Sequence, residues 1–194
     1  MRLLHIDSSI QDANSASRTL SALIVERLTA AAPDLQVTYR DLAASPLPHL
    51  TLPGSDAQVD TTVLEEFLAA NIVVIGAPMY NFGLPSQLKA WIDQIVIAGK
   101  TFQYGADGVV LGMASDKCVV IAHSRGGLYG AETPSAGNEH AESHLRAVFN
   151  FLGVADIEFI VAEGLAYGPE PREAAMAKAR EQIENIVSTR KVAA

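Results

Sequence analysis

Short apolar runs alternate with longer stretches of helical periodicity along almost the whole chain. The apolar runs predict five strands, at residues 2–7, 35–42, 71–77, 117–124 and 156–165. Apolar residues three and four positions apart predict helices over 20–31 (ended by Pro33), about 60–70, 88–96, 145–152 and 176–187. Prolines within 43–58 predict a loop, and the turn residues within 99–117 predict a hairpin.

Strands that alternate with helices indicate a parallel sheet with helices on both faces, because each crossover places a helix over the sheet. The apolar runs "IVVIGA" and "CVVIA" fit strands that are buried on both sides. Five such units predict an α/β fold, a flavodoxin-like doubly wound five-stranded parallel sheet, as a single domain over residues 1–194. Ligands bind such sheets beyond the carboxyl ends of the strands, where the strand order reverses. We therefore expect the site in the loops after strands one, three and four.

Composition and charge limit the classes of function. The net charge of −8 over 194 residues argues against a nucleic-acid partner, which requires a basic face. No signal-peptide segment opens the chain and no apolar run reaches the roughly 20 residues of a membrane helix. We expect a soluble cytoplasmic protein with no membrane partner. The single cysteine, Cys118, lies in an apolar run and is read as core packing.

The loop after the first strand, "DSSIQDANSASR", gathers hydroxyl groups around a helix start. Asn14 or Ser15 is a natural cap, and the free amides of a first helical turn suit a phosphate. Arg18 could add charge to such a site or point away from it. Neither G-x-G-x-x-G nor a Walker A loop is present, so the loop suits a mononucleotide phosphate better than a pyrophosphate. The alternative is a capped helix with incidental serines.

The loop after the third strand, "GAPMYNFGLP", carries a thioether, two aromatic rings and an amide where small polar residues are usual in a turn. Gly76, Pro78, Gly83 and Pro85 predict a fixed, bent backbone that could aim peptide groups at the edge of a planar ring. The alternative is a loop that folds its own aromatics into the core.

The loop after the fourth strand, "HSRGGLYG", allows close approach to backbone N–H groups at Gly126 and Gly127. His123 is a candidate for orienting this loop or meeting a substrate, and Arg125 for contacting an anion. His140 and His144 have the spacing of a metal pair, with Glu139 and Glu142 nearby. No third ligand motif accompanies them, so we expect a solvated helix face and no metal site. The three loops together predict a bound mononucleotide cofactor.

These loops, with "DLAASPLP", "QLKAWID", "TFQY" and "AEGLAYGPE", resemble the family of FMN-dependent NADH-azoreductases, also described as NAD(P)H:quinone oxidoreductases. The resemblance covers almost the whole chain, and "PMYNF" together with "SRGG" is its most specific part. It implies an enzyme that uses FMN and takes hydride from NADH or NADPH in a two-step reaction, reducing quinone or azo compounds. The segment at 50–62 looks short against the family pattern, which bears on the pocket rim.

The resemblance also assigns residues to the site. It implies that the phosphate of FMN is held by Ser9, Ser15, Ala16 and Ser17. It implies that one border of the isoalloxazine ring is formed by Met79, Tyr80, Asn81 and Phe82. It implies that a second border, near flavin N1 and O2, is formed by Ser124, Arg125, Gly126 and Gly127. Tyr129 is a weaker candidate at the O2 edge. The family is homodimeric, which implies that Tyr104 and Phe151 reach a site across the subunit interface. No side-chain acid or base is expected to be essential.

Two other classes of function remain open from the sequence. One is a flavodoxin-type carrier that binds FMN but passes single electrons between proteins. The other is a nucleotide-sensing module without enzymatic activity. The residues do not decide between NADH and NADPH, since no acidic residue or basic cluster is placed to recognise the adenosine ribose.

Overall fold

The computed structural model describes residues 1–51 and 61–189. Its strands are β1 (Arg2–Asp7), β2 (Gln36–Asp41), β3 (Ile72–Pro78), β4 (Phe102–Tyr104), β5 (Val110–Gly112), β6 (Cys118–Ser124) and β7 (Asp156–Ala162). Its helices are α1 (Ala16–Ala31), α2 (Thr61–Ala69), α3 (Ser86–Ile95), α4 (Ala141–Phe151) and α5 (Pro169–Thr189), with short 3-10 turns at Asp12–Asn14 and Ala136–Asn138.

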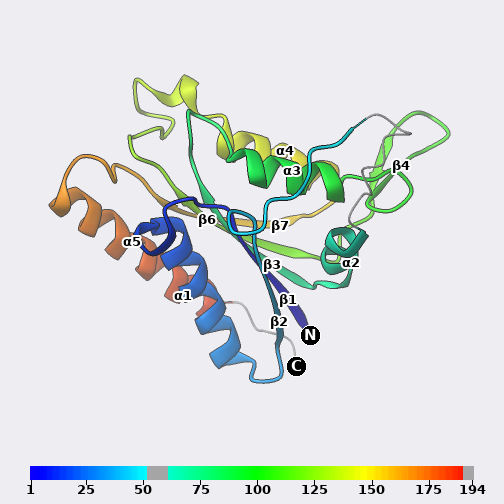
Figure 1. Cartoon of the computed structure of the whole chain (residues 1–194), viewed down its shortest axis with the longest axis horizontal. Helices are drawn as coiled ribbons and strands as arrows, with labels where there is room; N and C mark the ends of the chain where they lie inside the picture. The colour runs from blue at the N-terminus through cyan, green and yellow to red at the C-terminus, as the bar shows by residue number, and fades with distance from the viewer. Residues whose placement is uncertain (52–60, 190–194) are drawn as a thin grey trace.

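Five strands form one parallel sheet in the order β2-β1-β3-β6-β7 (Figure 1). The predicted doubly wound parallel sheet is therefore confirmed. The chain moves from β1 outward to β2, then returns to the other side of β1 and continues through β3, β6 and β7. The reversal lies between β1 and β3, where Asp7 pairs with Gly76, and Pro78 pairs with Ser124 on the next strand. The carboxyl ends of these three strands thus meet at the switch point.

Helices cover both faces of the sheet (Figure 1). On one face α1 and α5 pack together, with Leu20 and Ile24 of α1 in the same apolar cluster as Met176 and Ile183 of α5. On the other face α2, α3 and α4 enclose a larger cluster around Trp91, whose ring meets Phe67 edge to face. β3 is buried at every residue, which explains its unbroken apolar run.

The structure moves several element ends from their predicted positions. Three helices begin earlier than expected: α1 at Ala16, α4 at Ala141 and α5 at Pro169. Their first turns are polar, so apolar spacing alone does not mark them. The fifth strand ends at Ala162 instead of residue 165, because the following residues form a loop against the β6 loop. The segment at 50–62, which looks short against the family pattern, consists largely of residues 52–60, and these lie outside the described residues.

The predicted hairpin is the antiparallel pair β4–β5. It docks on the end of α4 through two glycines: a Cβ at Gly112 would lie 2.2 Å from the backbone nitrogen of Gly153. Gly153 itself has a φ of +87°, a conformation that favours glycine. The amide of Ala114 donates to the carbonyl of Leu152 at 2.8 Å beside this contact. Main chain therefore packs against main chain at this junction.

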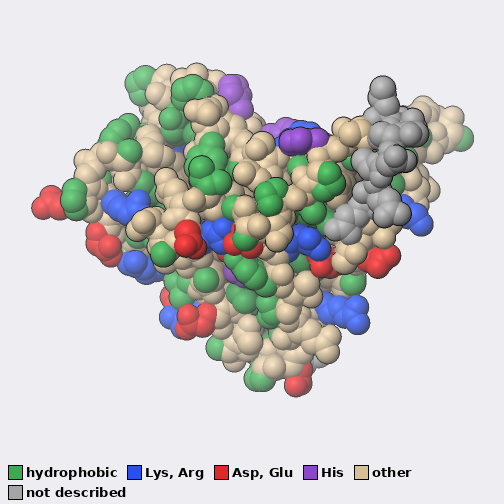
Figure 2. Space-filling view, viewed as in Figure 1, with side chains coloured by type: hydrophobic (Ala, Val, Ile, Leu, Met, Phe, Trp, Pro, Cys, Tyr) green, Lys and Arg blue, Asp and Glu red, His purple; other side chains and the backbone are tan. Residues whose placement is uncertain are grey.

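Acidic and basic side chains are interspersed on the surface seen in Figure 2, without a large patch of one sign. Within the described ranges, no helix combines the length and the apolar character needed to cross a bilayer.

Candidate functional site at the switch point

The loop after β1 leads into α1 through a capped helix start. The Ser15 hydroxyl accepts from the amide of Arg18 at 3.2 Å and lies 3.1 Å from the Ser17 hydroxyl. Both serines are almost fully buried. The amides of Ala16 and Ser17 in the first turn donate to no group in the described chain. They leave two N–H donors at the positive end of the helix dipole.

The loop after β3 makes a tight turn in which Tyr80 and Gly83 exchange two backbone hydrogen bonds of 3.0 Å. The residues between them, Asn81 and Phe82, have φ values of +48° and +70°. Gly83, one of the residues expected to bend this loop, does not have a positive φ. A phenylalanine at positive φ is uncommon and strained, so the turn holds Phe82 in a costly conformation. Its ring is half-exposed and meets Tyr129 edge to face.

Tyr80 joins the loop after β1 to the loop after β3. Its hydroxyl lies 3.1 Å from the Ser9 hydroxyl and accepts from the amide of Ile10 at 3.1 Å. The amide of Met79, just before it, donates to the carbonyl of Ser124 at 2.8 Å. All three predicted loops are thus connected to one another by hydrogen bonds.

The loop after β6 pairs with the loop after β7. Leu165 and Ala166 donate backbone hydrogen bonds to the carbonyls of Arg125 and Gly126, and Gly164 donates to the carbonyl of Gly127. The carbonyls of this loop are therefore used. The amides of Gly126 and Gly127 find no acceptor in the part of the chain that the structure describes. These two amides are a second pair of N–H donors that is available to a ligand.

These loops enclose a pocket of about 240 Å³. Six of its lining residues were predicted from the sequence: Ala16, Met79, Tyr80, Ser124, Arg125 and Gly126. The rest of the lining is Gln11, Pro78, Leu165, Ala166 and Arg172. A wider hollow of about 600 Å³ shares Gln11 and Arg172 with it and extends over Ala13, Asn14 and Thr19. The two hollows meet at the start of α1.

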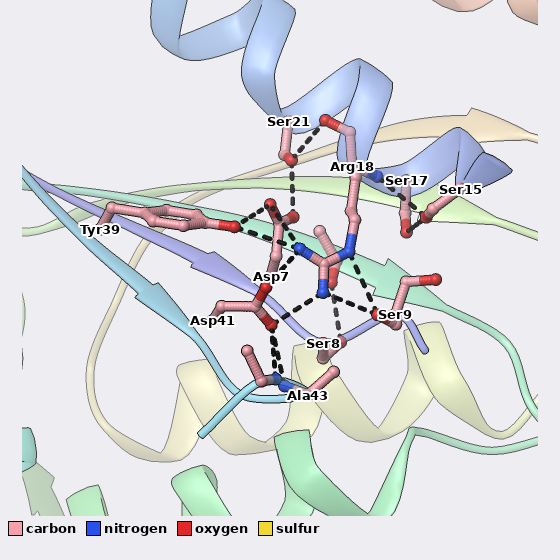
Figure 3. A network of polar contacts seen from close by, with 12 residues as sticks. Asp7, Ser8, Ser9, Ser15, Ser17, Arg18, Ser21, Tyr39, Asp41 and Ala43 are labelled. Atoms are coloured by element: carbon pink, nitrogen blue, oxygen red, sulfur yellow. Dashed lines mark hydrogen bonds and ion pairs between the residues drawn. The ribbon is translucent and has the colours of Figure 1, made fainter. Parts of the chain in front are cut away.

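Behind the first loop, Arg18 is held by a network of polar groups (Figure 3). Its Nη1 and Nη2 donate to the two carboxylate oxygens of Asp41, each at 2.7 Å. Its Nε and Nη2 donate to the carbonyl of Ser9 at 3.1 and 2.8 Å. The side-chain hydrogen bond from Arg18 is the main cause that lowers the pKa of Asp41 to about 2. The guanidinium therefore holds the serine loop from behind.

Tyr39 and Asp7 extend this network. The Tyr39 hydroxyl donates to Asp7 Oδ2 at 3.2 Å and accepts from Arg18 at 3.1 Å. Burial, and then the nearby charges of Asp7 and Asp41, raise the pKa of Tyr39 to about 12. Ser21 donates to the other oxygen of Asp7 at 2.8 Å. Asp7 is thereby fixed directly before the serine loop.

Arg125, the first residue of the loop after β6, is buried, and three carboxylates surround its guanidinium. It binds Glu142 directly and lies 3.5 Å from Glu163 and 4.0 Å from Glu139. Burial alone would raise the pKa of Glu139, but His123, the amides of Glu142 and Ser143, and Arg125 together hold that pKa well below its usual range. The positive charge of Arg125 is thus neutralised within the protein, and Arg125 contributes to the pocket as part of its wall.

The model of the flavodoxin-like fold family matches residues 1–187. An FMN-dependent NADH:quinone oxidoreductase 2 of Bradyrhizobium diazoefficiens is 54% identical over 200 residues, covering 96% of this chain and 98% of the relative. The chain belongs to this family of quinone oxidoreductases. A Xanthomonas campestris member is 50% identical and covers 96% of this chain and 99% of its own. The resemblance to the azoreductase and quinone oxidoreductase family is confirmed.

Solved structures of azoreductases share the fold. Azoreductase AzrA superimposes with a TM-score of 0.87 at 27% identity, covering 98% of this chain and 100% of its own. The azoreductase from Bacillus anthracis gives a TM-score of 0.88 at 26% identity with the same coverage. The oxidoreductase fold therefore extends over the full length of these neighbours.

Several residues that the oxidoreductase family implied do not line the pocket of this chain. Ser9, Ser15, Ser17, Asn81, Phe82 and Gly127 belong to the loops around it, and Tyr129 packs on Phe82 at the rim. Tyr104 and Phe151 lie with Phe102 in an aromatic cluster on the hairpin and α4. Figure 1 places that hairpin on the opposite side of the view from the start of α1. Their expected role across an interface stays a prediction.

Sequence reasoning missed Gln11, Leu165, Ala166 and Arg172 as pocket residues. Leu165 and Ala166 follow β7, whose carboxyl end lies beside that of β6 in the sheet. Because β7 pairs with β6, the loop after β7 lies next to the site, and the motif "EGLAYG" marks that loop in the sequence. Gln11 and Arg172 come from polar stretches with no distinguishing pattern. They are found only once α1 and α5 are seen to pack together.

The expected solvated face around His140 and His144 is partly wrong. His140 is exposed just before α4, but His144 is half-buried, and burial, followed by the charge of Lys89, lowers its pKa. Glu139 and Glu142 bind Arg125. Among the described residues, no three His, Cys, Asp or Glu side chains are grouped to hold a metal ion. His123 is fully buried, with Nδ1 2.7 Å from the carbonyl of Ala77, so it holds the backbone beneath the loops and does not face the pocket.

Proposed function

We propose that this chain is an FMN-dependent NADH:quinone oxidoreductase that also reduces azo compounds by a two-step, ping-pong reaction. The proposal is carried by one observation: a pocket at the switch point is bordered by backbone amides that have no acceptor in the described chain. The names of relatives that are 50% or more identical support FMN and NADH. The azo acceptors rest on the azoreductase neighbours.

The donor set fits the chemistry of FMN. The amides of Ala16 and Ser17 stand at a helix N-terminus, which suits a phosphate dianion. Gly126 has room for a ligand: a Cβ there would meet only the Cβ of Ala166, at an ordinary 3.5 Å. Protein packing therefore does not require glycine at this position, and we assign its open side to the ring. The apolar thioether of Met79 and the aromatic ring of Tyr80, which both line the pocket, suit the face of that ring.

FMN, when bound, supplies hydride chemistry at N5, and the protein supplies placement and electrostatics. If FMN is bound, its reduction would place negative charge near N1 and O2, and fixed N–H donors would stabilise that charge where water is scarce. We assign the amides of Gly126 and Gly127 to this task. Their carbonyls are already bonded to Gly164 and Ala166, so the loop holds these donors in place before any ligand arrives.

The pocket offers little to serve as an acid or base. Its side chains that titrate are those of Tyr80, Arg125 and Arg172, and Arg125 is bound to Glu142. The proposed chemistry accordingly needs no essential side-chain acid. Donor and acceptor can then use the same open face in turn, which predicts ping-pong kinetics.

We further propose a homodimer that forms through the hairpin. Five apolar side chains gather there with exposures of 38–67%: Tyr104, Val109, Leu111, Met113 and Phe151. Exposed apolar residues that cluster in this way mark interaction surfaces. In this arrangement Tyr104 and Phe151 approach the site of the partner, as the family implies. A cytoplasmic location stays a prediction from the sequence.

Anaerobic titration with NADH tests the proposal. The purified protein loaded with FMN should be yellow and should bleach with one equivalent of NADH, then recover its colour with one equivalent of a quinone. A flavodoxin-type carrier would stay yellow with NADH. A nucleotide-sensing module without flavin would be colourless from the start. Parallel lines in double-reciprocal plots, with NADH and quinone varied together, would support the ping-pong reaction.

A further inference from the structure

Arg125 and Arg172 line the two hollows, and Arg18 lies behind the serine loop; the charges of Arg18 and Arg125 are already neutralised. Arg18 is bound through both terminal nitrogens to Asp41. Arg125 lines the pocket with its guanidinium among three glutamates. The charge of each of these two guanidinium groups is compensated inside the protein, and breaking either ion pair is costly because both partners are largely removed from water.

Arg172, in the first turn of α5, is different. Its Nη2 donates to the carbonyl of Asn14 at 3.2 Å, and within the described residues it has no carboxylate within 4.0 Å. One hydrogen bond to a neutral carbonyl fixes the guanidinium in place but leaves its charge uncompensated. The other guanidinium N–H groups have no acceptor in the described chain. Arg172 therefore presents a positioned cation with free donors.

The position of Arg172 links it to the proposed phosphate end of the site. It lines both hollows, together with Gln11, and the carbonyl that it binds belongs to the residue before the Ser15 cap. The packing of α5 on α1 brings it there across 158 positions of sequence. No aspartate or glutamate belongs to the described lining of either hollow, although the chain carries a net charge of −8. An anion is therefore favoured at this place.

We propose that Arg172 is a phosphate-binding residue of this enzyme, acting from α5 on a phosphate group that reaches the start of α1. The inference rests on the proposed function, and it adds a cation from α5 to a cradle that the family resemblance assigned to Ser9, Ser15, Ala16 and Ser17. Arginine suits this task because its planar fork donates two parallel hydrogen bonds to a phosphate. The phosphate is that of the flavin or that of the nicotinamide donor, and binding measurements separate these two sources.

The test compares Arg172→Gln with Arg180→Gln. Arg180 lies further along the same helix and its Nη1 binds Glu173 at 2.8 Å, so both variants lose one positive charge from α5. Dissociation constants for FMN and for riboflavin, which lacks the phosphate, are measured on apoprotein by flavin fluorescence. Arg172→Gln should weaken FMN binding about tenfold and leave riboflavin binding unchanged. Arg172→Lys should restore part of the loss, and added salt should reduce the difference.

A second arm uses enzyme saturated with FMN and measures KM and kcat for NADH and NADPH. If Arg172→Gln keeps both flavin affinities but raises the KM of either donor several-fold with kcat unchanged, the phosphate is the donor's, and the proposal holds. If Arg172→Gln matches Arg180→Gln in both arms, the proposal is overturned. Wild-type protein that binds neither flavin would overturn the proposed function and this inference with it. Normal flavin binding by wild type, together with an Arg172→Gln variant that behaves like Arg180→Gln, would overturn this inference alone.

Discussion

Arg18 and Asp41 form a two-pronged ion pair, with Nη1–Oδ2 and Nη2–Oδ1 distances of 2.7 Å each. The same guanidinium donates twice to the carbonyl of Ser9. The pair therefore joins three elements, since Asp41 ends β2, Arg18 lies in α1 and Ser9 belongs to the loop between β1 and α1 (Figure 3). Arg18 was a candidate ligand contact by sequence, and its structural role is support.

Replacing Arg18 with methionine should lower the free energy of unfolding by about 1–3 kcal/mol, because Asp41 and the Ser9 carbonyl both lose a charged donor. This loss is smaller than for a deeply buried ion pair, because the side chains of Arg18 and Asp41 are 15% and 23% exposed and water screens their charges. Urea titration measures the change. Arg40→Met is the matched control, because Arg40 lies on the same strand as Asp41 and makes a similar two-pronged bond to Glu66 of α2. Only Arg18→Met should also weaken FMN binding.

The same pair makes stability depend on pH. Because the pKa of Asp41 is lowered to about 2 from its ordinary 3.8, its ionised form stabilises the fold above about pH 4, and this contribution is lost as the pH falls toward 2. Unfolding free energies of wild type and Asp41→Asn should therefore differ most near neutral pH and converge below pH 4. A constant difference between the two from pH 7 to pH 2 would contradict the assignment.

The sheet was predictable because buried parallel strands carry their own signature. All five strands were found, since "IVVIGA" and "CVVIA" have no competing periodicity. The switch-point loops followed from the rule that ligands bind doubly wound sheets where the strand order reverses. The ion pairs were not predictable: Arg18 and Asp41 are 23 positions apart, and Arg125 takes its carboxylates from the start of α4 and from Glu163, which follows β7. Such ion-pair partners depend on how the helices pack against the sheet, and the spacing of residues in the sequence does not reveal that packing.

The junction between Gly112 and Gly153 sets the position of the hairpin. Gly112→Ala would place a Cβ 2.2 Å from a backbone nitrogen, which cannot move as a flexible side chain can. We expect a loss of about 1–3 kcal/mol in unfolding free energy, as for overpacking in a core. Gly137→Ala, where a Cβ would meet nothing within 4 Å, is the control. If the hairpin forms the dimer interface, sedimentation should show more monomer for Gly112→Ala alone.

Gly126 tests the assignment of the ring site. Because a Cβ there meets only Ala166 at 3.5 Å, Gly126→Val should fold with a midpoint temperature close to that of wild type. Its two extra methyl groups would occupy the pocket, so FMN affinity or the rate of flavin reduction by NADH should fall at least tenfold. Stopped-flow absorbance measures the rate, with Gly137→Val as a control. Normal FMN content and a normal rate in Gly126→Val would remove this loop from the site.

Phe82 poses a different question, because its conformation costs stability. At a φ of +70° an L-residue other than glycine loses about 1–2 kcal/mol, while the edge-to-face contact with Tyr129 returns about 0.5–1.5 kcal/mol. Phe82→Gly, which creates the Asn-Gly pair that such turns prefer, should therefore change the unfolding free energy by less than about 1 kcal/mol.

Phe82→Ala separates strain from the loss of the ring. Alanine keeps the penalty at positive φ without the aromatic contact, so it should be less stable than Phe82→Gly by about 1 kcal/mol, the reverse of the usual order. Both variants should lose quinone reduction alike if the half-exposed ring borders the site. Urea titration and kcat/KM for a quinone measure the two effects. Full activity in Phe82→Gly would mean that the strained ring serves the fold and not the reaction.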